Sequence, residues 1–250
     1  MRAIYILWLR QLKRYSRSRA RIISSLAQPV IYLLAMGYGL TGVFQQAGMG
    51  SYIQFVTPGL IGMTILFTSV FSGIELLMDR QFGFLKETLV APVPRVWIIL
   101  GRILGGATVA MIQGTLFLGV CFIAGFRLEH FSTLPLVFLF MALTAILFTA
   151  LGSAIGAMLQ DMQAFQFVVS FLIMPLFLLS GAIFPLKNLP KALTIATDLN
   201  PLTYGVDGLR QALIGADYRH FGLGTDFAVL TGFAVLLVAF GSYRFSKIQL

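Results

Sequence analysis

The residue types that usually carry chemistry are few in this sequence, and their spacing builds none of the common catalytic or metal sites. His130 and His220 are far apart, and Cys121 lies in an apolar stretch with no companion at metal-ligand spacing. None of the five lysines is followed by Ser or Thr, which the lysine of a phosphate-binding P-loop requires. We therefore predict no catalytic residue, no metal site and no ATP site within this chain.

The composition indicates an integral membrane protein. Of the 250 residues, 58% are hydrophobic and 11% are charged, and the mean hydropathy is +0.89. Soluble domains have about 45–50% apolar and about 25% charged residues. With 23 Phe and a single Cys, the sequence also excludes a disordered chain, a collagen and a disulfide-rich secreted domain.

Charge-free stretches of roughly 20 residues or more, the length needed to cross a bilayer, predict six transmembrane helices. They lack the short alternating pattern of barrel strands, so the predicted fold class is all-α and polytopic. The six predicted spans cover residues 22–44, 53–77, 97–124, 134–158, 164–184 and 225–243. Within them, the pairs Gly101 with Gly105 and Gly152 with Gly156 predict close helix packing.

Residues 1–21 precede the first span and are predicted to form an amphipathic interfacial helix, followed by the six-helix domain over residues 22–250. Tyr5, Trp8 and Tyr15 recur at helical spacing, and arginines line another face. Aromatic rings at head-group depth and basic side chains toward lipid phosphate are typical of such helices. The alternative is a solvated tail beside the membrane.

The distribution of Lys and Arg predicts that both termini are cytoplasmic. In this orientation 13 of the 18 basic residues lie inside, and the cytoplasmic side carries the entire net charge of +9. Anionic lipid of the inner leaflet is then the simplest partner for the basic excess, and nucleic acid is not needed to explain it.

Glu75 and Arg102 each lie about one turn inside the cytoplasmic end of a predicted span. A charge at this depth is expensive unless it is paired or hydrated. We expect the two to form a structural ion pair near the interface, and the alternative is a polar element of an inner gate. A proton relay is disfavoured because no second carboxylate lies within the predicted membrane core.

Two connecting segments are larger than their connections require. The cytoplasmic loop of residues 79–95 contains a predicted amphipathic helix at about 80–91, stopped by Pro92, which suits docking of a soluble partner. The outer segment of residues 185–222 is too apolar for a free loop, so we predict short re-entrant helices at 188–199 and 203–214. Thr203 is the candidate N-cap of the second helix.

At these loops the sequence resembles the membrane subunits of ABC exporters of the type-2 class, which move drugs, lipids and polysaccharides outward. The resemblance covers nearly the whole chain and includes the basic N-terminal helix and the six spans. Its local motifs are the segments Gln54–Gly59, Lys86–Arg95, Pro175–Pro185 and Asn200–Tyr204. Each motif is weak evidence alone. Their order along the chain, together with the predicted topology, argues against a chance match.

The resemblance implies a dimer of six-helix subunits, formed with a second copy or a similar permease, bound to two cytoplasmic ATPase subunits that hold Mg-ATP. The implied ATPase-coupling residues are Phe82, Phe84, Leu85, Lys86, Glu87, Leu89 and Pro92. The implied substrate cavity, placed by span position only, comprises Thr64, Phe67, Phe71, Phe171, Met174 and Phe177. The implied outer gate comprises Phe184, Pro185, Leu189 and Tyr204. A Phe or Met in a membrane helix can equally face lipid or a neighbouring helix.

The function that follows is the permease subunit of an ATP-driven exporter in a bacterial plasma membrane, with ATP hydrolysis in a separate subunit. The aromatic, nearly charge-free spans favour a hydrophobic or amphiphilic cargo such as a drug, a lipid or a lipid-linked glycan. One alternative is an ATP-independent channel or secondary carrier. Another is a membrane-embedded lipid-modifying enzyme, which the scarcity of intramembrane His, Asp and Glu disfavours.

Overall fold

The computed structural model describes residues 2–46, 51–84, 90, 92–186, 189–215 and 219–246. Within these ranges the chain is helical and contains no strand, as the all-α prediction requires. The helices are α1 (Arg2–Arg17), α2 (Arg19–Gly39), α3 (Thr41–Gln46), α4 (Tyr52–Gln81), α6 (Arg95–Ile123), η1 (Phe131–Thr133), α7 (Leu134–Met158), α8 (Met162–Leu178), α9 (Lys191–Asp198), α10 (Pro201–Ile214) and α11 (Leu223–Ser246).

Five helical segments in the described part of the chain are long and apolar enough to cross a membrane. They are Ile22–Gly39, Tyr52–Gln81, Arg95–Ile123, Phe131–Met158 and Leu223–Ser246. The predicted span at 164–184 corresponds instead to α8, whose 17 residues cover only about 25 Å. Its helix ends early because the chain turns at Gly181, which has a φ of 71° that disfavours residues with a side chain.

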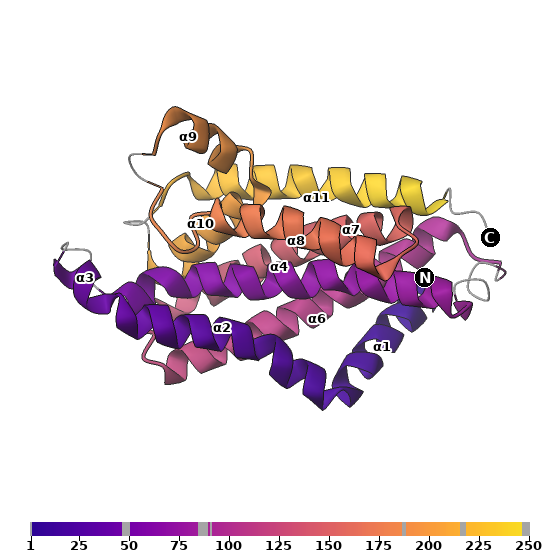
Figure 1. The fold of residues 1–250 in the computed structure, drawn as a ribbon, viewed down its shortest axis with the longest axis horizontal. Helices are drawn as coiled ribbons and strands as arrows, with labels where there is room; N and C mark the ends of the chain where they lie inside the picture. Colours follow the sequence, from indigo (N-terminus) through magenta and orange to yellow (C-terminus); the bar gives the residue numbers. More distant parts are fainter. Residues whose placement is uncertain are drawn as a thin grey trace.

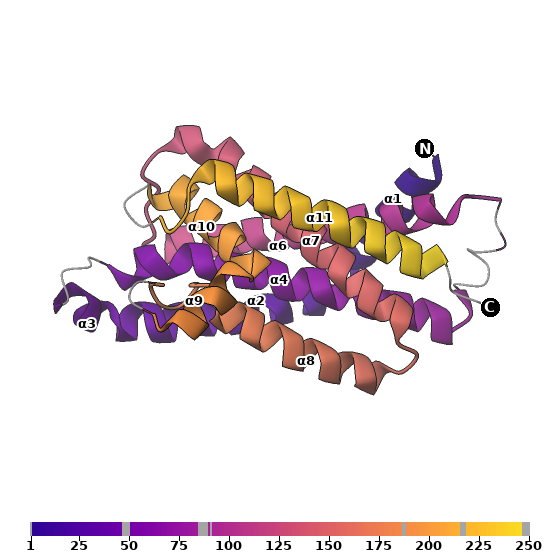
Figure 2. The same ribbon diagram turned by 90° about the horizontal axis from the view of Figure 1, so that it is seen from above.

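The long helices run side by side along the molecule, and α4 is the helix that the others surround (Figures 1 and 2). It packs against α2, α6, α7, α8 and α10. The first and last described residues lie at one end of the bundle, which we call the terminal end. Helices α3, α9 and α10 lie at the opposite end, which we call the distal end.

Glycines permit the closest helix crossings in the bundle. A Cβ atom added at Gly152 would lie 2.4 Å from the carbonyl oxygen of Val70, and one at Gly156 would lie 2.6 Å from that of Gly73. Helices α4 and α7 therefore meet backbone to backbone, and the packing predicted for Gly152 and Gly156 is confirmed.

The second predicted glycine pair, Gly101 with Gly105, packs against the N-terminal helix and not against a membrane span. Cβ atoms at Gly101 and Gly105 of α6 would meet α1, at Leu7 and at Gln11 respectively. The pair therefore seats the N-terminal helix on α6. This helix ends at Arg17, four residues before the predicted boundary, and α2 begins directly after Ser18.

Candidate functional site

The predicted coupling segment lies at the terminal end, and only part of it is described. Leu85, Lys86, Glu87 and Leu89 lie outside the described residues. Helix α4 ends at Gln81, after which Phe82 and Phe84 expose more than half of their surfaces. Pro92, the predicted stop of the segment, is also exposed.

A charged cluster joins α1, α4 and α6 directly before this segment. Asp79 of α4 and Arg102 of α6 are each 6% exposed, and Arg102 donates a hydrogen bond to Asp79. From α1, Arg10 also donates to Asp79 at 3.1 Å, and Arg14 lies 3.9 Å from the same carboxylate. We call Arg10, Arg14, Glu75, Asp79 and Arg102 the basal cluster. Its charges connect three helices at the point where α4 approaches its end.

Asp79 is the functional candidate that the sequence analysis missed, because it was assigned to the loop. The structure extends α4 beyond Asp79, and Asp79 lies four residues after Glu75, on the same face of the helix. Glu75 was predicted to pair with Arg102. It lies 4.0 Å from Arg14 and belongs to the same cluster as Arg102. The hydrogen-bonded carboxylate of Arg102 is nevertheless Asp79. A predicted helix that continued past residue 77 would have placed both Glu75 and Asp79 on this face of α4.

Polar contacts further fix α1 on the bundle. The indole of Trp8 donates to Thr108 Oγ1 at 3.0 Å, and the hydroxyl of Tyr15 donates to Gln113. Gln113 in turn donates to Ser25 of α2 at 2.6 Å. Two of the aromatic residues predicted to sit at lipid head-group depth therefore bind α6 instead. Their position couples α1 to both α2 and α6.

A groove of about 620 Å³ opens between α1 and the end of α4. It combines basic side chains from α1 with the exposed phenylalanines that follow α4. Its lining is Ile6, Leu9, Arg10, Lys13, Arg14, Arg17, Met78, Asp79, Phe82 and Phe84. This surface can attract an acidic group while burying an apolar one.

Half of the predicted substrate cavity comes together between α2 and α4. Thr64, Phe67 and Phe71 line a pocket of about 250 Å³. The rings of Phe67 and Phe71 are stacked, with centroids 6.2 Å apart. The rest of its lining is Tyr15, Ser24, Ser25, Gln28, Pro29, Met63 and Thr68.

The other half, on α8, is not brought to this pocket. Phe171 is 78% exposed and Met174 is 42% exposed, so both face away from the body of the subunit. Phe177 is 2% exposed and packs in the hydrophobic core. The six residues predicted to line the substrate cavity are therefore divided among a pocket, the exposed surface of α8 and the hydrophobic core.

The predicted outer gate residues lie around α9 and α10 at the distal end. The hydroxyl of Tyr204 donates to the carbonyl of Asp198 at 2.7 Å, and its ring stacks on Phe221 at a centroid distance of 4.7 Å. Burial raises the pKa of Tyr204 above its ordinary value, so it stays a hydrogen-bond donor at neutral pH. Phe184 is exposed, and Pro185 and Leu189 are half-buried.

Helix α10 is inserted into the bundle, in contact with α4, α7 and α11. Its N-cap is Asn200 and not Thr203, because the Asn200 side chain accepts a hydrogen bond from the Leu202 amide at 3.0 Å. Asn200 also donates to the Leu176 carbonyl of α8 at 2.6 Å. Thr203 donates to the Thr197 carbonyl instead. The cap position thus ties the start of α10 to α8.

Buried charges at the distal end are bound mainly by the main chain. Asp207 accepts hydrogen bonds from the amides of His220 and Phe221, at 2.9 and 2.7 Å, and from the side chain of Gln211. Gln211 also donates to Asp226 of α11 at 2.9 Å. Asp207, Gln211 and Asp226 form what we call the distal cluster. It holds His220 and Phe221 beside α10 and joins α10 to α11.

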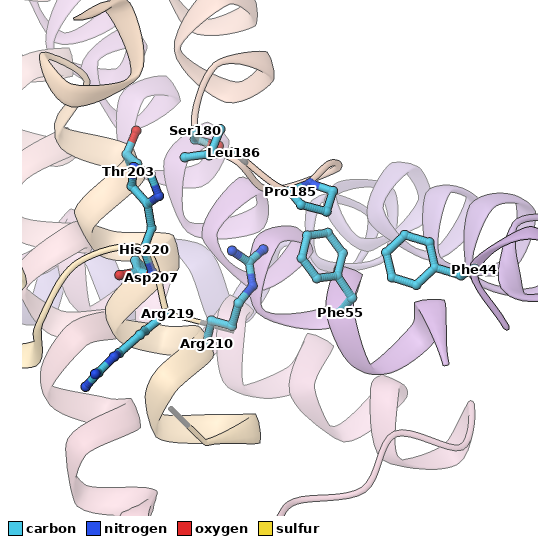
Figure 3. A pocket seen from close by; sticks show the side chains of 10 residues that line it. All are labelled: Phe44, Phe55, Ser180, Pro185, Leu186, Thr203, Asp207, Arg210, Arg219 and His220. Carbon is cyan, nitrogen blue, oxygen red and sulfur yellow. Dashed lines mark hydrogen bonds between the residues drawn. The ribbon is translucent and has the colours of Figure 1, made fainter. Parts of the chain in front are cut away.

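Arg210 is buried beside this cluster and lines a pocket at the distal end (Figure 3). Its guanidinium donates to the Gly181 carbonyl at 2.8 Å and lies 4.3 Å from the centroid of the Phe55 ring. Burial lowers the pKa of Arg210 to about 10, so the side chain remains charged at neutral pH.

Comparison with known proteins gives consistent matches over most of the chain. The model of a family described as ABC-2 type transporter matches residues 2–214. Nodulation protein J of Rhizobium meliloti (strain 1021) is 30% identical over 208 residues, which is 82% of this chain and 78% of that protein. The inner membrane transport permease YadH of Escherichia coli (strain K12) is 29% identical over 253 residues, which is 99% of this chain and 94% of that protein.

Proposed function

Since the chain belongs to the ABC-2 type transporter family, we propose that it is the transmembrane permease subunit of an ATP-driven exporter. Its cargo is a hydrophobic or amphiphilic compound that leaves the cytoplasm or the inner leaflet. The subunit crosses a bacterial inner membrane six times, with the short helix α8 as one crossing and both termini in the cytoplasm. The concentration of basic residues at the terminal end supports this orientation.

The observation that carries the proposal is the basal cluster next to the coupling segment. A subunit without an ATP site must receive work through contacts that differ between the states of a partner. The hydrogen bonds of Asp79 join α4 to α1 and α6. A displacement of the segment after Phe82 would therefore move these three helices together. Two cytoplasmic ATPase subunits, each binding Mg-ATP, are the proposed source of that push.

The groove beside the basal cluster supports two kinds of contact at the membrane surface. Phe82 and Phe84 offer apolar side chains to the ATPase. Lys13 and Arg17 of α1 are exposed, and they can face the phosphates of anionic lipid. One face of α1 would then contact the membrane surface, while its opposite face packs against α6.

The substrate path is proposed to run between this subunit and a second permease copy. The exposed side chains of Phe171 and Met174 on α8 are then oriented toward the partner or the path, and Phe67 and Phe71 supply an aromatic wall. A path with these walls suits apolar or amphiphilic cargo.

The test is reconstitution of the full chain in proteoliposomes with and without its ATPase. We expect cargo to accumulate against a gradient only when the ATPase and ATP are both present. Equal transport by the chain alone would establish an ATP-independent carrier or channel and overturn the proposal.

A charge reversal in the coupling segment tests the route of coupling. We expect Glu87→Arg to abolish most transport and most cargo-stimulated ATP hydrolysis, while membrane insertion remains normal. The matched control is Lys191→Glu, a charge reversal at an exposed residue at the start of α9, and it should transport normally. Wild-type coupling in Glu87→Arg would contradict the assigned contact.

A further inference from the structure

The distal pocket combines a buried cation with apolar walls. Its volume is about 90 Å³, enough for one small polar group but not for a whole drug-sized molecule. The charged and polar lining residues are Ser180, Thr203, Asp207, Arg210, Arg219 and His220. Its apolar lining is Phe44, Phe55, Pro185 and Leu186.

Arg210 lines this pocket, and its guanidinium has donor capacity that the described residues do not use. One of its N–H groups binds the Gly181 carbonyl, while its Nε is buried and has no hydrogen-bond partner among the described residues. Figure 3 shows the group between Phe55 and the Ser180–Leu186 turn. An unsatisfied buried donor on a charged side chain is costly, so an acceptor that reached this guanidinium from the pocket would relieve that cost.

In the described part of the chain, no hydrogen bond joins Arg210 to the other polar residues of the lining, whose own bonds go elsewhere. Asp207 is already held by three hydrogen bonds, from the His220 and Phe221 amides and from Gln211. The hydroxyls of Ser180 and Thr203 donate to main-chain carbonyls at 2.6 and 2.8 Å. The cationic side chains are therefore the described lining groups that best suit an anionic ligand.

The charge of the lining favours an anion of one negative charge. Among the described lining residues, two arginines against one aspartate leave one positive formal charge when His220 is neutral. Arg219 lies at the exposed mouth with its guanidinium directed away from Arg210, so it attracts through charge at the entrance (Figure 3). A phosphodiester carries one negative charge and offers oxygens that match the guanidinium fork.

We propose that the distal pocket binds the phosphodiester group of an anionic amphiphile, with Arg210 as its principal contact. The apolar part of the amphiphile lies along Phe44, Phe55 and Pro185, which form the adjoining wall. This binding does not depend on export, and it is measured on the purified chain without an ATPase.

The experiment measures binding of fluorescent, short-chain phosphatidylglycerol to the full chain in neutral detergent. Lys13→Gln with Arg17→Gln serves as the background, because the basic groove at the terminal end also attracts anionic lipid. We expect binding to be weakened about tenfold by Arg210→Lys, which keeps the charge but loses the fork. Leu186→Trp, which fills the pocket without removing a charge, should weaken it similarly.

The controls separate this site from general lipid binding. Arg127→Gln removes an exposed arginine at the same end of the molecule but outside the pocket, and it should leave binding unchanged. Phosphatidylcholine should bind much more weakly. If dimethyl phosphate displaces the fluorescent phosphatidylglycerol and binds with the same affinity, the ligand is a soluble phosphodiester. If dimethyl phosphate does not compete, the ligand is a lipid head group.

Two results would overturn the proposal. One is equal binding of phosphatidylglycerol to the background chain and to monodisperse Leu186→Trp. The other is equal binding of phosphatidylglycerol and phosphatidylcholine.

Discussion

The two ends of the bundle stabilise buried charges in different ways. In the basal cluster, Asp79 binds side chains from two other helices, Arg10 and Arg102. In the distal cluster, Asp207 binds main-chain amides of the segment that follows its own helix, and nearby Arg210 binds a main-chain carbonyl. One arrangement joins helices to one another, and the other holds a local fold in place.

This difference suggests different mechanical roles. Ion pairs between side chains of separate helices can exchange partners when the helices move, which is a common device in switching interfaces. A carboxylate bound to successive amides loses those bonds only if the local backbone unfolds. We therefore expect the basal cluster to rearrange during transport while the distal cluster keeps α10 and α11 together.

Removal of Asp79 should give the largest loss of stability. In Asp79→Ala the buried guanidinium of Arg102 loses its hydrogen-bonded carboxylate, and breaking a buried pair in this way costs about 3–5 kcal/mol. Thermal unfolding of the purified chain, followed by size-exclusion chromatography, would record the loss. The double variant Asp79→Leu with Arg102→Met should recover most of it, since no buried charge is then left alone.

Glycine substitutions at the two ends test backbone packing. A Cβ at Gly59 would lie 2.2 Å from the Ala182 carbonyl oxygen, whereas the closest contact of one at Gly105 would be the Gln11 side chain, at 2.7 Å, with the backbone of Trp8 no nearer than 3.4 Å. Gly59→Ala should therefore cost about 1–3 kcal/mol or more, and Gly105→Ala should cost less. Equal midpoints of thermal unfolding in the two variants would refute this ranking.

Neutralising Asp207 should have an intermediate effect. Asp207→Asn places an amide donor among the amides of His220 and Phe221, and the loss of one or two hydrogen bonds to a charged acceptor costs about 1–3 kcal/mol. Hydrogen exchange should rise in the residues after α10 and not in α1. Faster exchange in α1 would mean that the two clusters are coupled.

The smallest effect is expected at Arg14, which is 41% exposed and lies 3.9–4.0 Å from Asp79 and Glu75. Exposed ion pairs contribute about 0–1 kcal/mol and are screened by salt. Arg14→Gln should therefore change the unfolding temperature slightly at low salt and not at high salt. A large change that persists in high salt would show that Arg14 belongs to the buried part of the cluster.

The sequence by itself determined the class of protein and most of its elements. Length, apolarity and the absence of charge are local properties, and a helix that satisfies its own backbone in lipid follows from them. The absence of a P-loop is equally local, because that motif is contiguous in sequence. Turns that end a helix early are less visible, and α8 therefore stops at Leu178 and not at 184.

Only the tertiary structure decided which residues meet. Arg10 and Asp79 are 69 positions apart, Trp8 and Thr108 are 100 apart, and the pairing depends on how each helix is rotated about its axis. The same rotation turned Phe171 outward and Phe177 into the core, although both lie on α8. Hydropathy is similar on all faces of a membrane helix, so the pattern that reveals the span carries little information about its partners.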